Sequence, residues 1–569
     1  MESEPPSKKP RATAESSTGE VVLLDYGAGN VQSVINAVAS LGFTVRIAQS
    51  PADILAADRL IFPGVGSFGS CVAMLKEKGY FEPLKKYLTD DRPFFGICLG
   101  MQTLFEGSEE SEGVAGLGIL PGIVTRFPRS LGLAVPHIAW TGVSPMLRDP
   151  WPLETPSPRC YFVHSYRVPM PAGGHAPWAL ACSEYGERYV CAVRKGNCVA
   201  TQFHPEKSGQ AGLDLLQRWL QGRPVGLKGV AAEAPQPDMV TPLPPARRII
   251  ACLDVRSNDA GDLVVTKGDQ YDVREGGQVR NHGKPVALAS RYYEEGADEV
   301  TFLNITAFRD LVLADQPMLN VLHDAAKTVF VPLTVGGGIR SYVDKDGKKY
   351  SSLEVADAYF RAGADKVSIG SDSVEAAVAY YAGGCKLSGT TSIECISKKY
   401  GRQAVVISVD PRRVYVRDPA ETKHACVEVG RPGGTPVGPS GERFAWYCCT
   451  LKGGRENSDV DVVQLVKAME ALGAGEVLLN CIDRDGQGNG YELELIQQVK
   501  AACSLPVIAS SGAGRPDHFE EALSPMDKER GGGGGADAAL AAGIFHRQEV
   551  PICDVKAHLA EKTSIPVRR

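Results

Sequence analysis

The chain contains 569 residues, which is enough for two or more domains, each with its own core. Its 61 basic and 67 acidic residues give a net charge of −6, so the composition argues against a nucleic-acid partner. No run of about 18 apolar residues occurs, and we therefore predict no membrane partner. The 15 cysteines show no paired spacing, which predicts reduced thiols and no metal site.

Residues 1–19 are rich in proline, serine, lysine and glutamate, and we predict a disordered tail. The short basic cluster at residues 8–11 is more typical of a solvated tail than of a nuclear signal. Acidic residues such as Glu2 and Glu4 are unusual in a transit peptide. We therefore expect a cytoplasmic protein, with a plastid as the alternative if the source is a photosynthetic eukaryote.

Residues 20–222 form the first predicted domain. Apolar runs that predict strands alternate with segments of helical periodicity, such as Val31–Leu41. This alternation predicts an open, mostly parallel α/β sheet with flanking helices and a site beyond the carboxyl ends of its strands. The expected strands are Val21–Asp25, Thr44–Ala48, Arg59–Pro63, Pro93–Cys98, Cys160–Arg167 and Cys198–His204.

A cysteine flanked by glycines, Gly96-x-Cys98-x-Gly100, follows one of these apolar runs. The pattern predicts a tight turn from strand to helix, because glycine adopts backbone angles that other residues avoid. A helix N-terminus that points at the thiol favours its thiolate form. Taken alone, the pattern fits a buried structural cysteine equally well.

Two further features suggest a nucleophilic site around Cys98. His204 and Glu206 lie two residues apart at a predicted strand end and therefore face the same side. The carboxylate can fix the imidazole tautomer while the second ring nitrogen accepts the thiol proton. The backbone amides of Gly64, Val65 and Gly66, together with that of Leu99, could bind an oxyanion. A glycine loop alone is more often a plain turn.

In these motifs the domain resembles the class I glutamine amidotransferases. The residues that carry the resemblance are Gly96–Gln102 and Gln202–Glu206, and the stretches Pro136-His137 and Tyr161–Tyr166 narrow it to the glutaminases of histidine biosynthesis. The resemblance implies that Cys98 is the nucleophile, His204 the base and Glu206 its orienting acid. It also implies that glutamine contacts Gln102 and the Gly64–Gly66 loop and releases ammonia through a thioester.

Residues 223–246 are rich in proline and lack periodicity, which is typical of a semi-rigid linker. Residues 247–569 form the second predicted domain, because eight apolar strands each precede a helical stretch. This pattern predicts a (β/α)8 TIM barrel with insertions at Tyr342–Ser352, Arg412–Trp446 and the polyglycine Gly531–Gly535, the last a mobile loop. The expected strands are Ile249–Asp254, Glu299–Asn304, Phe330–Val335, Lys366–Ile369, Ala404–Asp410, Glu476–Cys481, Pro506–Ala509 and Ala538–Ala542.

The carboxyl ends of barrel strands carry the chemistry of this fold. Asp254 and Asp410 end the first and fifth strands, on opposite sides, so that one carboxyl can act as acid and the other as base. Small residues that admit phosphate oxygens end the third, fourth, seventh and eighth strands, and three polar or small residues follow the sixth. These candidates are Gly336, Gly337, Gly338, Gly370, Ser371, Asp483, Asp485, Gly486, Ser510, Ser511, Gly512, Ala542 and Gly543. Two opposed cradles predict an elongated substrate with a phosphate at each end.

The second domain resembles the cyclase of the imidazole glycerol phosphate synthase family. The carrying stretches include Arg248–Val255, Val265–Gly268, Leu333–Ile339, Cys481–Gly486 and Ile508–Gly514. The resemblance implies conversion of phosphoribulosylformimino-aminoimidazole-carboxamide ribotide, a bisphosphate, to imidazole glycerol phosphate and aminoimidazole-carboxamide ribotide. It implies that Asp254 and Asp410 are the acid–base pair and that Lys267 closes over the substrate, and no cofactor is expected.

The same resemblance implies a charged ring at the barrel mouth, formed by Arg248, Glu299, Lys366 and Glu476. Ammonia would pass this ring and stay neutral in a dry barrel core, although ordinary salt bridges would explain the same residues. We therefore expect a monomer with two paired domains and small-molecule substrates. The alternatives are a glutaminase that serves another acceptor and a scaffold protein with decayed sites.

Overall fold

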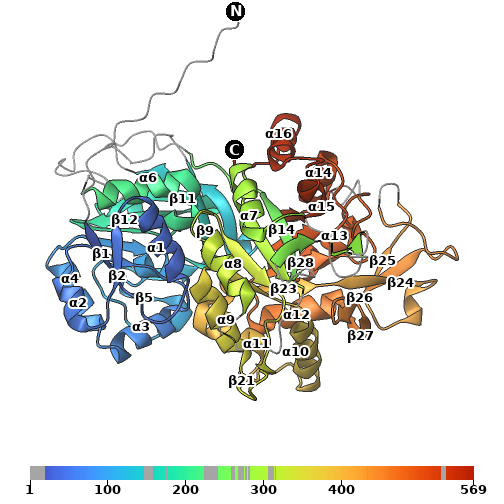
Figure 1. Cartoon of the computed structure of the whole chain (residues 1–569), viewed down its shortest axis with the longest axis horizontal. Helices are drawn as coiled ribbons and strands as arrows, with labels where there is room; N and C mark the ends of the chain where they lie inside the picture. Colours follow the sequence, from blue (N-terminus) through green and yellow to red (C-terminus); the bar gives the residue numbers. More distant parts are fainter. Residues whose placement is uncertain are drawn as a thin grey trace, which may run out of the picture.

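The structure is a computed structural model of the chain. It describes residues 19–146, 158–174, 176–222, 241–257, 263–266, 282–305, 313, 316–431, 434–526 and 533–569, and the backbone of the strands β16 (Arg274–Glu275) and β17 (Gln278–Val279). The two predicted domains lie side by side, with the first in blue to cyan and the barrel in green to red (Figure 1).

The first domain is built on an 11-stranded sheet whose first five strands in spatial order, β2-β1-β3-β4-β13, are parallel, as predicted, while β12, β10 and β6 continue it antiparallel. The predicted strand Cys160–Arg167 is divided at Ser165 between two sheets, because β9 pairs with β7 and β10 pairs with β12. The strands are β1 (Glu20–Leu23), β2 (Thr44–Ile47), β3 (Leu60–Phe62), β4 (Phe94–Ile97), β5 (Gly107–Ser108), β6 (Ile123–Arg126), β7 (His137–Gly142), β8 (Ser144–Pro145), β9 (Arg159–His164), β10 (Tyr166–Pro169), β11 (Ala179–Tyr185), β12 (Glu187–Lys195) and β13 (Cys198–Thr201).

Helices cover both faces of this sheet, and two separate apolar clusters pack against it. Tyr26, Phe62 and Phe94 belong to one cluster, and Phe95, Phe162 and Trp219 belong to the other. The helices are α1 (Val31–Ser40), α2 (Pro51–Ala56), α3 (Phe68–Glu77), α4 (Phe81–Thr89), α5 (Leu99–Gln102) and α6 (Gly209–Leu220).

The second domain is a closed parallel barrel of eight strands, which confirms the predicted (β/α)8 fold. The eighth strand pairs with the first, and β15 (Leu263–Thr266) extends the sheet as an antiparallel neighbour of β14. The barrel strands are β14 (Arg248–Ser257), β18 (Glu299–Asn304), β19 (Leu333–Gly336), β22 (Lys366–Ile369), β23 (Val405–Val409), β28 (Glu476–Asn480), β29 (Val507–Ser510) and β30 (Ala538–Ala541).

The outer helices alternate with these strands. Capping boxes at Ser351, Thr391 and Asp461 fix the starts of three of them, because each cap bonds reciprocally with the third helical residue. The helices are α7 (Pro285–Glu294), α8 (Pro317–Ala325), α9 (Ser352–Ala362), α10 (Ser371–Ala382), α11 (Ser392–Tyr400), α12 (Val462–Leu472), α13 (Leu493–Ala502), α14 (Pro516–Leu523), α15 (Gly543–His546) and α16 (Ile552–Lys562).

The predicted insertions form small antiparallel sheets, with β20 (Tyr342–Val343) pairing β21 (Lys349–Tyr350). A second sheet contains β24 (Pro411–Val416), β25 (Cys426–Glu428), β26 (Phe444–Leu451) and β27 (Glu456–Asp461). In the polyglycine stretch, residues 531–532 lie outside the described residues. The Gly534 and Gly535 amides donate to the carbonyls of Glu521 and Ser524 at 2.8 Å, so this part is anchored rather than a free loop.

The two domains contact each other directly. Residues 241–246 run along the first domain, and Ala246 forms a backbone bridge with Trp140. The Trp140 indole donates to the carbonyl of Asp298 at 3.1 Å, and the Arg568 guanidinium lies 4.2 Å from the Trp140 ring centroid. The C-terminus therefore lies where the two domains meet (Figure 1).

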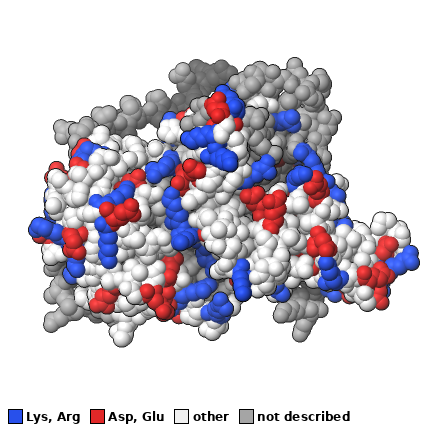
Figure 2. All heavy atoms as spheres, turned by 90° about the horizontal axis from the view of Figure 1, so that it is seen from below, with Lys and Arg blue, Asp and Glu red and all other residues white. Residues whose placement is uncertain are grey.

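Three general features of the chain can be compared with the sequence-based predictions: its surface charge, its cysteines and its helix lengths. One face of the molecule shows basic and acidic side chains interspersed over its described part (Figure 2). All 15 cysteines are free thiols, as predicted. Within the described residues no helix combines the length and hydrophobicity that a membrane span requires.

Candidate active sites

Cys98 lies at a sharp turn between β4 and α5. Its backbone has φ +51° and ψ −102°, an unusual conformation for a residue with a side chain. A Cβ at Gly100 would lie 2.2 Å from the carbonyl oxygen of Phe62, so only glycine fits there. The turn confirms the elbow predicted from the flanking glycines, and the Cys98 side chain is buried.

His204 and Glu206 lie beside Cys98, at the end of the neighbouring strand β13. The Glu206 carboxylate contacts His204 Nδ1 at 2.8 Å, and Cys98 lies close enough for its charge to act on the imidazole. Burial lowers the pKa of His204, but the charges of Glu206 and Cys98 outweigh burial and hold its pKa well above the usual value. The three side chains therefore have the arrangement of a Cys-His-Glu triad.

Gln202 is a contact of Cys98 whose individual role the sequence did not reveal. Its Nε2 donates to the Cys98 sulfur at 3.4 Å, and its Oε1 accepts from Gln102 Nε2 at 3.0 Å. Gln102 also donates to the carbonyl of Tyr166 at 3.1 Å. Gln202 belongs to the strand-end motif of the sequence, but only the fold shows that its side-chain amide reaches Cys98 at the end of the neighbouring strand β4.

The loop Gly64–Gly66 packs directly on the elbow, as predicted. However, the Leu99 amide donates to the Gly64 carbonyl at 3.5 Å, and the Val65 amide donates to the Tyr26 hydroxyl at 3.1 Å. Both amides thus have protein acceptors, and an oxyanion would have to displace these bonds. A Cβ at Gly66 would lie 2.9 Å from the Lys399 carbonyl oxygen, so the loop also touches the barrel at the end of α11.

Glu110 is a second feature that sequence reasoning missed. Its carboxylate accepts from the Phe68 amide at 2.7 Å, directly after the glycine loop. Burial raises the pKa of Glu110. The residue lies in a short 3-10 turn with no motif of its own, so the sequence carried no signal for it.

A cavity of about 510 Å³ opens at the carboxyl ends of the barrel strands. Asp254 and Asp410 both line it, from opposite sides of the barrel. Burial, followed by the charge of Asp485, raises the pKa of Asp254 to about 7. Burial also raises the pKa of Asp410 to about 6, against the effect of a 3.1 Å hydrogen bond from Asn480. Two carboxyls that face one cavity, with pKa values raised toward neutrality, are the arrangement expected of an acid–base pair.

Of the two predicted phosphate cradles, only one lines the cavity. Seven of the predicted substrate-binding residues line the cavity: Asp485, Gly486, Ser510, Ser511, Gly512, Ala542 and Gly543. The opposed set, Gly336, Gly337, Gly338, Gly370 and Ser371, ends the third and fourth strands but is absent from this lining. Ser371 accepts from the Lys452 amide at 2.9 Å, and Asp483 accepts from the Arg413 amide at 2.8 Å, so both bind the inserted sheet. Lys267 lies outside the described residues.

Arg248, Glu299, Lys366 and Glu476 form a closed ring at the amino ends of four barrel strands. Lys366 lies 2.7 Å from each carboxylate, and Arg248 pairs with Glu299 at 2.8 Å and also with Glu476. Their side chains are at most 1% exposed. Burial opposes the charge of Arg248, but the two glutamates raise its pKa. Apolar side chains, including those of Ile250, Val406 and Leu478, pack together between this ring and the cavity.

Tyr161 lies near both the triad and the ring of four charged residues. Its carbonyl accepts from the His204 amide at 3.0 Å. Its buried hydroxyl has no partner among the described residues, and burial followed by the charge of Glu299 raises its pKa. Beside it, Lys207 pairs with Asp365 of the barrel at 2.8 Å. The triad therefore sits against the amino end of the barrel, while Asp254 and Asp410 line its carboxyl end.

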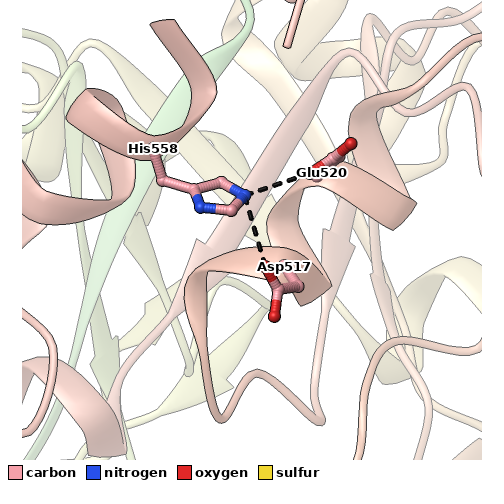
Figure 3. Close-up of side chains that lie close together, drawn as sticks. All are labelled: Asp517, Glu520 and His558. Atoms are coloured by element: carbon pink, nitrogen blue, oxygen red, sulfur yellow. Dashed lines mark hydrogen bonds and ion pairs between the residues drawn. The ribbon is translucent and has the colours of Figure 1, made fainter. Parts of the chain in front are cut away.

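Asp517, Glu520 and His558 carry the donor types of a metal site among the described residues. The His558 Nε2 lies 3.0 Å from Glu520 and 3.4 Å from Asp517 (Figure 3). These contacts join the outer helices α14 and α16, and none of the three residues lines the barrel cavity.

The fold and the two sites define a glutamine amidotransferase joined to a histidine-biosynthesis barrel. The model of the class-I glutamine amidotransferases matches residues 22–221, and that of the histidine biosynthesis proteins matches residues 248–551. Imidazole glycerol phosphate synthase hisHF of Schizosaccharomyces pombe is 54% identical, over 95% of this chain and 98% of its own length. The chloroplastic hisHF of Arabidopsis thaliana is 53% identical, over 98% of this chain and 91% of its own. The HisF subunit of Corynebacterium glutamicum (strain R) is 39% identical over 56% of this chain and 96% of its own.

The chain therefore belongs to the imidazole glycerol phosphate synthase hisHF family.

Proposed function

We propose that the chain hydrolyses glutamine in its first domain and passes the ammonia to the barrel. There it converts phosphoribulosylformimino-aminoimidazole-carboxamide ribotide to imidazole glycerol phosphate and aminoimidazole-carboxamide ribotide. The observation that carries this proposal is the placement of a cysteine triad and an aspartate pair at the two ends of one barrel.

In the first reaction, the Cys98 sulfur attacks the glutamine side-chain carbonyl and forms a thioester, and His204 transfers a proton to the departing ammonia. Water then hydrolyses the thioester, which releases glutamate and restores the Cys98 thiol. Glu206 holds the imidazole through its 2.8 Å contact with Nδ1. The amides of Val65 and Leu99 bind the oxyanion once they leave their present acceptors, with Gly64 and Gly66 allowing that change. Gln102 positions the substrate.

In the second reaction, Asp254 and Asp410 act as the acid–base pair. Burial raises the pKa of Asp254 to about 7 and that of Asp410 to about 6, so both carboxyls can exchange a proton near neutrality. One phosphate of the ribotide binds at Ser510–Gly512 and Ala542–Gly543. The other binds at Gly336–Gly338 and Gly370–Ser371, with Asp483, Asp485 and Gly486 beside the sugar and Lys267 closing over it.

The ring of Arg248, Glu299, Lys366 and Glu476 is proposed to gate ammonia. Replacing Lys366 by methionine leaves two buried carboxylates that share only Arg248. We expect a loss of about 3–5 kcal/mol in the free energy of unfolding. We also expect more than one glutamate released per imidazole product, because ammonia then escapes.

Denaturant unfolding and the ratio of glutamate to product measure these two effects. Lys327→Met is the matched control, because Lys327 forms an exposed ion pair with Asp324 and should change stability by less than about 1 kcal/mol. A ratio that stays at one in the Lys366 variant would remove the ring from the proposed gate.

We propose domain limits of 20–222 and 247–569, with a tail at 1–19 and a linker at 223–246. The chain would act as a monomer, because both sites and the path between them lie within it. The proposed location is the cytoplasm, with a plastid as the alternative that the chloroplastic relative keeps open.

The direct test supplies the purified chain with the ribotide and either glutamine or ammonium salt. Chromatography should detect imidazole glycerol phosphate and aminoimidazole-carboxamide ribotide with both nitrogen sources. Glutamate without imidazole product would favour a glutaminase for another acceptor. Absence of both products in a folded protein would favour a scaffold.

A further inference from the structure

Two buried polar atoms without a hydrogen-bond partner belong to residues that line the barrel cavity, among the residues that the structure describes. They are Thr266 Oγ1 and His546 Nε2. Thr266 lies opposite Asp254 in the pairing of β14 with β15, and His546 ends α15. A buried polar group without a partner is unfavourable, so such groups in a cavity mark places where a ligand can supply the missing bond.

A hydrogen bond with Tyr292 sets where His546 carries its proton. The Tyr292 hydroxyl lies 2.5 Å from His546 Nδ1, and the Arg291 guanidinium packs over the face of the Tyr292 ring. As the donor of this pair, the tyrosine hydroxyl gives its hydrogen to Nδ1. The neutral imidazole then carries its hydrogen on Nε2, the atom that has no partner.

The surroundings keep this imidazole neutral. His546 is 8% exposed, and its ring stacks on that of His282 with the centroids 5.4 Å apart. Burial, followed by the charges of His282, Arg291 and Arg547, lowers the pKa of His546 to about 3. His546 therefore offers an N–H donor without a charge near neutral pH.

We propose that His546 is a substrate-binding residue whose Nε2–H donates to a phosphate oxygen of the ribotide. This phosphate binds at Ala542 and Gly543, one helical turn before His546. The His546 amide donates to the Ala542 carbonyl at 3.0 Å, so the small pair and the imidazole belong to the same turn. The N–H donor recognises an oxygen acceptor. Tyr292 acts as a positioning residue that sets the tautomer of His546. This inference rests on the proposed function for the identity of the ligand.

The test compares His546→Ala with His546→Gln in ammonia-driven cyclisation. Alanine should raise the KM for the ribotide about 10- to 100-fold with a much smaller change in kcat, because a hydrogen bond to a charged group is lost. Glutamine places an amide N–H close to the position of Nε2 and should keep KM within about fivefold. Tyr292→Phe should give an intermediate KM, because either imidazole tautomer is then allowed.

His558→Gln is the matched control, because His558 has a 9% exposed side chain on the outer helix α16 (Figure 3). It should leave KM unchanged. An unchanged KM in His546→Ala, or a glutamine variant as impaired as alanine, would overturn the proposal.

A second measurement does not depend on turnover or on a folded variant. Nitrogen-15 NMR of the histidine-labelled native chain should show His546 as the Nε2–H tautomer, and inorganic phosphate should shift that resonance. The Nδ1–H tautomer, or no shift at saturating phosphate, would contradict the role of His546. If the native chain fails to convert the ribotide, the proposed function fails, whereas this spectrum still decides the tautomer and the phosphate contact.

Discussion

Replacement of Cys98 by alanine should lower glutamine-dependent product formation by about a thousandfold or more, because no other side chain can form the thioester. Product formation from ammonium salt should stay within about threefold of the native rate. The reason is spatial: Cys98 lies in the first domain, while Asp254 and Asp410 line a cavity at the far end of the barrel.

Cys71→Ala is the matched control for this experiment. Cys71 is a fully buried free thiol on α3 that contacts neither the triad residues nor the barrel cavity. Both nitrogen sources should support product formation at nearly native rates in this variant. If Cys98→Ala loses both activities while its circular dichroism and melting temperature stay native, the two reactions are not divided between the domains as proposed.

Replacement of Asp254 by asparagine should lower cyclisation by about a thousandfold with either nitrogen source, while glutamine hydrolysis persists. Asparagine keeps the shape of the side chain but cannot supply a proton. Liquid chromatography of both products and of glutamate measures the two reactions separately. Unchanged cyclisation would remove Asp254 from the proposed acid–base pair.

The same variant has a predicted effect on stability that depends on pH. The folded pKa of about 7 lies above the ordinary aspartate value, so the folded state holds a proton that the unfolded state releases. Stability from this group is therefore present at pH 4 and is lost as pH rises through 7. Asp254→Asn should melt at the native temperature near pH 4 and above it at pH 8, and an equal or lower melting temperature at pH 8 would contradict the shift.

Much of the fold was predictable because both domains follow regular patterns. The strands that end in Asp254 and Asp410 are apolar runs, and buried parallel strands require such runs. Gly100 predicted the elbow, and the structure shows why glycine is required: a Cβ there would overlap the Phe62 carbonyl. These signals depend on local sequence and backbone geometry, and a single chain displays them.

Other features depend on contacts between distant segments, which no local pattern encodes. Tyr161 lies near the ionic ring on β9, which pairs with β7 in a separate sheet. Glu110 approaches the glycine loop through a tertiary turn. The amides of Val65 and Leu99 were expected to be available, but the Tyr26 hydroxyl and the Gly64 carbonyl accept from them.

The transfer of ammonia through the barrel can be measured with isotopes. The chain is given the ribotide, glutamine labelled with nitrogen-15 in its side-chain amide, and an excess of unlabelled ammonium. Mass spectrometry should find the label in nearly all of the imidazole glycerol phosphate formed from glutamine, after subtraction of the product made from ammonium alone. Label diluted to the proportion in the surrounding solution would show that ammonia leaves the protein between the two sites.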